Sequence, residues 1–112
     1  MTLESLKAYG ANTDEGLNRC MNNEAFYLRM IDKAMQDDSY ENLKAAVESG
    51  DLARSFEIAH ALKGVTGNLA LTPIDTPVRE ITELLRSRTE MDYSAMLNEI
   101  IMRKNELTEL LR

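Results

Sequence analysis

Apolar residues recur along this 112-residue chain at intervals of three and four, the spacing that is typical of amphipathic helices. The pattern runs through long segments that are separated by stretches containing glycine, proline or charged residues. Its apolar positions are, in chain order, Leu28, Ile31 and Met35, then Leu43, Ala46 and Val47, then Ile58, Leu62, Val65 and Leu69, then Val78, Ile81, Leu84 and Leu85, and finally Tyr93, Met96, Leu97, Ile100, Ile101, Leu107 and Leu111. The pattern therefore predicts helices along most of the chain.

The N-terminal stretch predicts two short helices ahead of the long segments. Gly10 fits the end of the first, because glycine readily adopts the left-handed conformation past a helix terminus. Thr13 or Asp14 can cap the second, which is expected to hold Met21. Glu24 then starts the first long segment.

The connections between the long helices can also be located. Gly50 fits just past a helix end, and Asp51 fits the cap of the next helix. A second connection is predicted over Leu71–Pro77, where either Thr-Pro pair can supply a cap and a first helical residue. Asp92 is placed to cap the last helix. The run Asp37–Ser39 indicates either a bend or a change of neighbour, and the pattern leaves both open.

The composition supports an all-α fold. Hydrophobic residues make up 44% of the sequence, aromatic residues only 5%, and Met is present 7 times, a balance that favours helices packed by aliphatic side chains. Short connections make neighbouring helices antiparallel, which predicts an up-down-up-down four-helix bundle with short additional N-terminal helices. Residues 1–112 are expected to form a single domain, because a chain of 112 residues fits one hydrophobic core.

The only histidine of the chain lies in the segment EIAHALKGVTGNLA, residues 57–70. At about 100° per residue, Ile58, Leu62, Val65 and Leu69 form one apolar stripe that lies roughly opposite His60. The stripe is predicted to face the core, so His60 is predicted to point outward. The residues that share this outward face with His60 are Ala53, Phe56, Lys63, Gly64 and Gly67.

Two of these residues are glycines, and a glycine inside a helix costs about 0.8 to 1 kcal/mol relative to alanine. Gly64 and Gly67 lie beside the histidine and off the apolar stripe, so they are predicted to give a partner access to the imidazole. Phe56 either folds back to the edge of the core or meets another protein. With Ala53, it is predicted to line a docking surface.

Charge and composition exclude several classes of function. The formal net charge of −6 argues against nucleic-acid binding, which needs a basic surface to neutralise phosphates. One His and one Cys are too few ligands for a typical zinc site, so no metal site is predicted. No apolar run is long enough to span a membrane. The lone cysteine, Cys20, and the lack of an apolar leader predict a cytoplasmic setting.

The chemistry available to the histidine is narrow. Hydrolysis would need a Ser or Cys nucleophile, an orienting group and an oxyanion site, and the helix carries no such arrangement. A neutral imidazole nevertheless has a lone pair that can accept a transferred group. A phosphoryl group fits best, because Lys63 can offset its negative charge while a partner supplies Mg²⁺ and carboxylates.

The residues around the histidine also resemble a known family. Ala59–Gly64, with the sequence AHALKG, resembles the AHxLKG signature of histidine-containing phosphotransfer domains, the HPt family. The similarity covers most of the chain and extends to Gly16-Leu17-Asn18-Arg19, Phe26-Tyr27, Ser49-Gly50-Asp51 and Asn68-Leu69. One position departs, because this chain has Ala70 where many members have a glycine that suits a left-handed helix end better.

The resemblance implies a helical bundle that passes a phosphoryl group between receiver-domain aspartates in a two-component phosphorelay, or accepts it from a sensor histidine kinase. The chain would then be a phosphocarrier without an ATP site, a bound cofactor or a small-molecule substrate, and the partner receiver would bind Mg²⁺. Position by position, the resemblance implies that His60 is the phosphoacceptor and Lys63 the cation near the phosphoryl group. Gly64 would keep the histidine accessible, and Gly67 occupies a position where small residues are common.

Three other interpretations remain. A phosphotransfer-inactive adaptor or inhibitor would keep the bundle and bind a receiver or kinase without accepting phosphate. The chain could also be the phosphoacceptor domain of a chemotaxis-type kinase, although its start at Met1 and its final helix favour a free-standing protein. A purely structural bundle would leave the two glycines unexplained.

Overall fold

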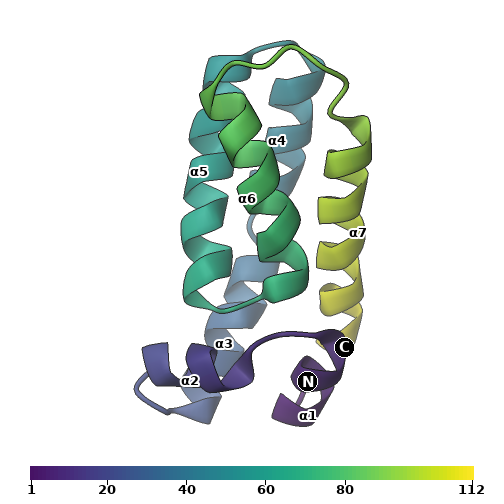
Figure 1. The fold of residues 1–112 in the computed structure, drawn as a ribbon. Coiled ribbons are helices and arrows are strands. Elements are labelled where there is room, and N and C mark those ends of the chain that lie inside the picture. Colours follow the sequence, from purple (N-terminus) through teal and green to yellow (C-terminus); the bar gives the residue numbers. More distant parts are fainter.

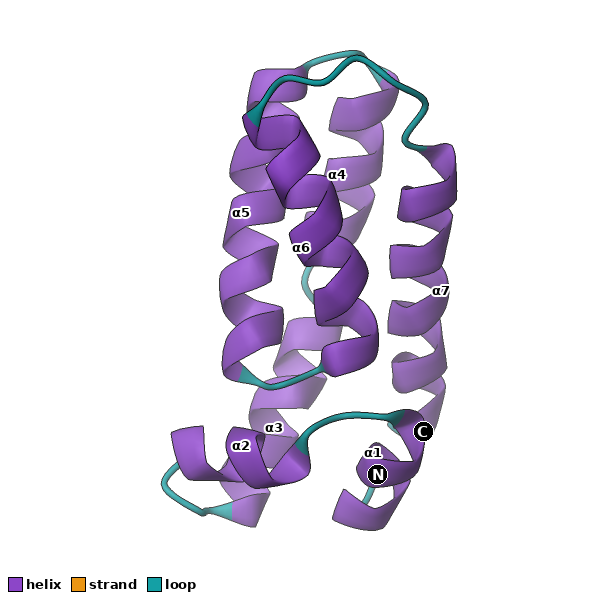
Figure 2. Cartoon of the chain, in the orientation of Figure 1, coloured by secondary structure: helices purple, strands orange, loops and turns teal.

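The structure, a computed structural model, describes all 112 residues and is built from helices and loops alone (Figure 2). The prediction of an all-α protein is therefore confirmed. The helices are α1 (Leu3–Tyr9), α2 (Thr13–Arg19), α3 (Glu24–Met35), α4 (Ser39–Glu48), α5 (Leu52–Asn68), α6 (Thr72–Arg86) and α7 (Ser94–Leu110).

The long helices lie side by side, and the short ones close one end (Figure 1). Helix α5 packs against α4 and, most extensively, against α6, while α7 contacts α6 and α3. Helices α3 and α4 follow one another along one side, so the arrangement fits a four-helix bundle. Helices α1 and α2 lie at the lower end in Figure 1, where both chain termini are found.

The core extends along the whole bundle and draws residues from six of the helices and the connection after α5. Most positions of the predicted apolar pattern are buried in it. The fully buried aliphatic side chains are Leu6, Ile31, Leu43, Leu71, Ile74, Val78, Ile81, Leu85, Ile100 and Leu107. Aliphatic burial of this kind is the main favourable contribution to folding.

The break between α3 and α4 falls where the sequence left two possibilities open. Helix α3 ends at Met35, and the Asp37 carboxylate accepts a hydrogen bond from the Ser39 amide at 2.8 Å as α4 begins. Hydrogen bonds from Ser39 also lower the pKa of Asp37. Helix α3 contacts α2 and α7, whereas α4 contacts α5, so the break accompanies a change of neighbour.

Glycine and aspartate terminate and cap helices where the sequence predicts it. Gly10 ends α1 with φ +114°, and Gly50 separates α4 from α5 with φ +78°. Asp51 caps α5 by accepting a hydrogen bond from the Arg54 amide at 3.0 Å. The glycines take up the left-handed conformations that β-carbon-bearing residues disfavour.

Helix α2 differs from its prediction at both ends. Its cap is Asn12, whose side chain accepts a hydrogen bond from the Glu15 amide at 3.2 Å, and neither Thr13 nor Asp14 serves. Met21 lies past the helix end with φ +57° and a side chain that is 81% exposed. Asparagine caps a helix as well as aspartate or serine does, so the polar run gave more than one possible start.

The connection predicted over Leu71–Pro77 is too long, although its first Thr-Pro pair does open the next helix. Helix α6 begins at Thr72, and both Pro73 and Pro77 lie within it. Pro73 falls in the first turn, where backbone amides have no hydrogen-bond acceptor within the helix, so its missing amide proton removes no hydrogen bond. Pro77 is buried near the start of the helix, and its missing amide proton removes only one backbone hydrogen bond there. The true connection is centred on Ala70, which adopts φ +55°.

The predicted core stripe of α5 is also partly wrong. Val65 is 42% exposed and Ile58 is only partly buried, whereas Leu62 and Leu69 are buried as predicted. The buried residues of the helix are Ser55, Ala59, Leu62 and Thr66. Because three of these four side chains are small, α6 can approach α5 closely, and the small face is turned inward in place of part of the aliphatic stripe.

The N-terminal helices hold the connection that follows α5. The Asn12 amide donates to the Ala70 carbonyl at 3.0 Å, and the Tyr27 hydroxyl donates to the Leu69 carbonyl at 2.7 Å. Burial raises the pKa of Tyr27 to about 12, since its ionised form would lie among apolar groups. These contacts fix the C-terminal end of the helix that carries His60.

Candidate functional site

Helix α5 presents His60 to solvent from the middle of the bundle. His60 is exposed, while its neighbour Ala59 is fully buried against the core. One turn earlier, the ring of Phe56 stacks on the imidazole with centroids 5.6 Å apart and 25° between the planes. Phe56 is itself partly buried and packs against the core. Phe56 thus folds back to the margin of the core, one of the two alternatives that the sequence left open. It remains partly exposed beside His60, so the other alternative, contact with another protein, stays compatible with its position.

Two arginines flank Phe56 from the end of α6. The guanidinium carbons of Arg86 and Arg88 lie 4.9 and 5.3 Å from the centroid of the Phe56 ring, within the range of a cation–π interaction. Neither arginine was identified from the sequence. The available signal was the antiparallel pairing of α5 and α6 around Ala70, which places the residues near position 84 opposite Phe56.

On the other side of His60 are a cation and an open backbone. Lys63, one turn later, is partly exposed and takes part in none of the salt bridges of the protein. A β-carbon built on Gly64 would meet no atom within 4 Å. Ala53, two turns before His60, is exposed. No bulky side chain from Gly64 or Ala53 therefore blocks the approach of a partner to the imidazole.

Gly67 has a different environment from Gly64. A β-carbon there would lie 3.1 Å from a terminal nitrogen of Arg79 and 3.7 Å from a carboxylate oxygen of Asp75, both on α6. Arg79 pairs with Asp75 at 2.6 Å, and this hydrogen bond together with the charge of Asp75 raises the pKa of Arg79. The buried Thr66 hydroxyl donates to the same carboxylate at 2.8 Å. Gly67 thus gives room to an ion pair within α6, and the Thr66 hydroxyl joins that pair to α5.

The exposed Val65 borders a groove between α3 and α5 on the side of His60 away from Phe56. The groove is lined by Met30, Lys33, Ala34, Asp37, Ser39, Ala61, Leu62, Val65, Asn68 and Leu69. Sequence reasoning missed this surface, because Val65 was assigned to the core. Of its α5 residues, Val65, Asn68 and Ala61, the residue after His60, are exposed.

No group of three or more His, Cys, Asp or Glu side chains is placed to hold a metal ion. None of the helices has both the length and the apolar character needed to cross a membrane.

Comparison with known proteins places the chain in a family. The Hpt domain family matches residues 31–112, which include α4 to α7 and the whole region around His60. The chain therefore belongs to the Hpt domain family. Neither the curated proteins nor the solved structures include one with significant similarity to it. Family membership implies histidine phosphotransfer in phosphorelays, in which Hpt domains act as phosphocarriers that interact with receiver domains and kinases and are not catalytic enzymes.

Proposed function

We propose that His60 is the phosphoacceptor of this protein, and that it takes a phosphoryl group from a receiver-domain aspartyl phosphate or a kinase and passes it to another receiver. The observation that carries the proposal is the surface of α5 itself. The only histidine of an Hpt-family chain is exposed there between a lysine without a carboxylate partner and a glycine with open space above it.

In the transfer step, the lone pair of a neutral imidazole nitrogen of His60 attacks the phosphorus of the partner's aspartyl phosphate. The new N–P bond forms as the P–O bond to the aspartate breaks, and the carboxylate leaves with that electron pair. The other ring nitrogen keeps its proton or releases it to water. The onward step is the reverse reaction on a second receiver, so atoms and charge balance across the relay.

The protein contributes positioning and electrostatics to this step. Lys63 lies one helical turn from His60, and its ammonium group can approach the phosphoryl oxygens without first leaving a carboxylate. Gly64 and the exposed Ala53 leave room for a partner to bring its own active site close to the imidazole. Phe56 is proposed to border the same docking surface. The Mg²⁺ that phosphoryl transfer needs would come with the partner receiver, and this domain would need no ATP site.

We also propose that residues 1–112 form one domain with up-down-up-down topology. The contacts of α4 with α5, α5 with α6 and α6 with α7 support antiparallel neighbours joined by short connections. The hydrogen bonds of Asn12 and Tyr27 to the connection after α5 support the inclusion of the N-terminal helices.

Phosphotransfer from a phosphorylated receiver tests the proposed role of His60. We expect the wild-type protein to take up radiolabelled phosphate that is stable in alkali and lost in acid, as a phosphoramidate is. His60→Gln should take up none. Binding of the receiver by His60→Gln serves as the control that this variant is folded. Binding of the receiver without labelling of the wild type would favour an adaptor or inhibitor instead.

A further inference from the structure

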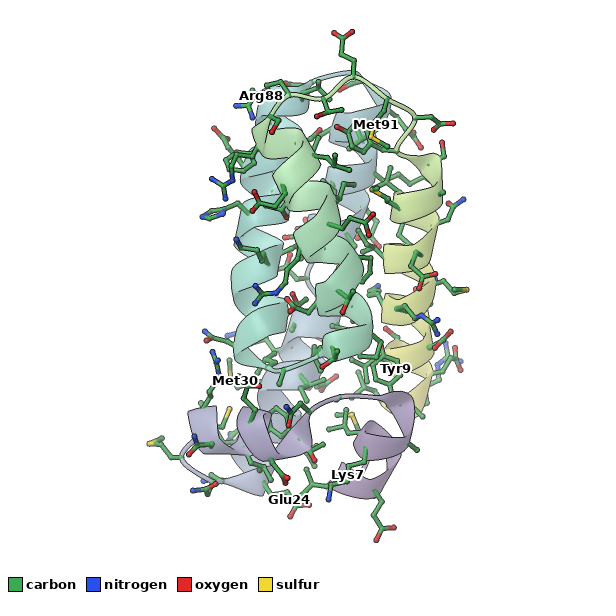
Figure 3. All side chains as sticks on the ribbon, viewed as in Figure 1. Lys7, Tyr9, Glu24, Met30, Arg88 and Met91 are labelled. Atoms are coloured by element: carbon green, nitrogen blue, oxygen red, sulfur yellow. The ribbon has the colours of Figure 1, made fainter.

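The Phe56 ring that stacks on His60 is itself contacted by two arginines, and the phosphoacceptor role of His60 does not require these contacts. Arg86 and Arg88 both place their guanidiniums over or beside the Phe56 ring. From the distances between the ring centroids and the guanidinium carbons, neither guanidinium is more than about 11 Å from the imidazole. Figure 3 places Arg88 at the end of the bundle where α6 passes into the loop to α7.

Arg88 occupies a backbone position that disfavours it. Its φ is +54°, the left-handed conformation that follows many helix ends and that glycine adopts most easily. Its amide donates to the Leu85 carbonyl at 3.0 Å, which closes the helix, and a glycine amide would do the same. Its side chain also donates to that carbonyl at 2.7 Å as it turns back towards Phe56. The backbone alone therefore gives no reason for an arginine here.

The charge around the site runs against the charge of the whole protein. The chain carries a net charge of −6, yet three cations lie near His60: Lys63 one turn along α5, and Arg86 and Arg88 against Phe56. Arg86 shares its charge with Glu83 at 3.1 Å, whereas Arg88 forms no salt bridge with a carboxylate. A solvated arginine with no carboxylate nearby keeps its full charge for an aromatic face or an anion.

We propose that Phe56, Arg86 and Arg88 are positioning residues of the phosphotransfer site. Phe56 limits the rotation of the imidazole by stacking on it, and the two guanidiniums hold Phe56 in place from α6. The ring of His60 then meets the incoming phosphorus in a narrow range of orientations. Such positioning of the reacting group accelerates group transfer. This inference rests on the proposed function, because it concerns how His60 is presented for that reaction.

The first experiment replaces Arg88 with glycine and measures both stability and transfer. Arg88→Gly removes the left-handed strain but also the side-chain hydrogen bond to the Leu85 carbonyl, so the thermal midpoint should change little, while the first-order rate of transfer within the receiver complex should fall by about 2- to 30-fold. The affinity for the receiver should change less than this rate. Arg88→Lys should restore part of the rate, because an ammonium can also lie over an aromatic ring.

Met21→Gly is the matched control. Met21 has almost the same backbone conformation, φ +57°, but is 81% exposed in the turn between α2 and α3. That turn lies at the opposite end of the bundle from the loop between α6 and α7 (Figure 1). The replacement of Met21 relieves the same strain without removing a side-chain contact, so it should raise the midpoint and leave the transfer rate unchanged. If Arg88→Gly transfers at the wild-type rate, the positioning role of Arg88 is wrong.

A double variant tests whether Arg88 acts through Phe56. In a Phe56→Leu background, the further change Arg88→Gly should have no effect on the transfer rate, because the ring through which it acts is gone. Additive losses would mean that Arg88 acts on the partner by its charge alone, and would overturn the proposal.

A nuclear magnetic resonance measurement separates this inference from the proposed function. The ring protons of His60 should show a ring-current shift from Phe56 that disappears in Phe56→Leu and shrinks in Arg88→Gly. An unchanged shift in Arg88→Gly contradicts the positioning role even if transfer occurs. A wild-type protein that shows these shifts but accepts no phosphoryl group contradicts the proposed function and leaves only the restraint of the His60 ring by Phe56 standing.

Discussion

Gly16 and Gly64 are helix glycines for which the structure predicts opposite effects of the same substitution. Gly16 is buried in α2, and a β-carbon there would overlap the phenol of Tyr27, including a ring carbon at 2.6 Å. The ring is fully buried, and its hydroxyl is bonded to the Leu69 carbonyl, so it cannot move aside freely. At Gly64 a β-carbon would meet nothing within 4 Å.

The magnitudes follow from the separate contributions. Gly16→Ala loses about 1 kcal/mol with the hydrogen bond of Tyr27 and about 1 to 3 kcal/mol through overpacking, and regains about 1 kcal/mol of helix propensity. The net loss in the free energy of unfolding is about 1 to 3 kcal/mol, or a fall in melting temperature of roughly 4 to 12 °C for a chain of this size. Gly64→Ala should raise the melting temperature by roughly 3 to 4 °C, because only the propensity changes.

Urea and thermal unfolding followed by circular dichroism measure both variants on one scale. A Gly16→Ala protein that is as stable as wild type would refute the packing of Tyr27 against α2. A marked loss of stability in Gly64→Ala would assign that glycine to packing and remove its role in access to His60. A bulky residue at Gly64, such as Leu, should instead slow phosphotransfer while the melting temperature stays the same or rises.

Further predictions concern the polar contacts that hold the bundle. Thr66→Val, which removes the donor to Asp75, should lower the free energy of unfolding by about 1 to 2 kcal/mol in urea titrations, and unchanged stability would show that the contact contributes little. Tyr27 has a pKa of about 12 in the folded state and an ordinary value of 10.0, so its contribution to stability should be constant below pH 10 and fall between pH 10 and 12. Tyr27→Phe should weaken this alkaline loss, and an identical pH profile would contradict the assignment. Deletion of residues 1–12 should lower the melting temperature, since it removes the amide of Asn12 that bonds the Ala70 carbonyl, and a deletion without effect would make the N-terminal segment dispensable.

The helical spacing of the apolar residues predicted most of the fold, because burial of aliphatic side chains at that spacing is what forms the bundle. It failed at Pro77 and at Val65 for two different physical reasons, the first local to α6 and the second in the packing of α6 on α5. Pro77 is accommodated because it loses only one hydrogen bond near the start of α6. Val65 is exposed because the small side chains of Ala59 and Thr66 let α6 pack on a neighbouring face of α5.

The candidate site was predictable only as far as it lies on one helix. The positions of His60, Lys63 and Gly64 on α5 follow from its local geometry, and the structure leaves all three at least partly open to solvent. Arg86 and Arg88 could not be found in that way, because they reach Phe56 only through the pairing of α5 with α6. The same holds for Arg79 and Asp75, which give Gly67 an environment that a helical projection does not contain.

The most direct measurement of the role of His60 is to locate the phosphoryl group after transfer. The wild-type protein is mixed with a phosphorylated receiver and Mg²⁺, digested under alkaline conditions, and the phosphorylated peptide is sequenced by mass spectrometry. The proposed function predicts a single phosphorylated residue, His60, and no acid-labile phosphate in His60→Gln. Phosphate on any other residue, or equal labelling of His60→Gln, would contradict it.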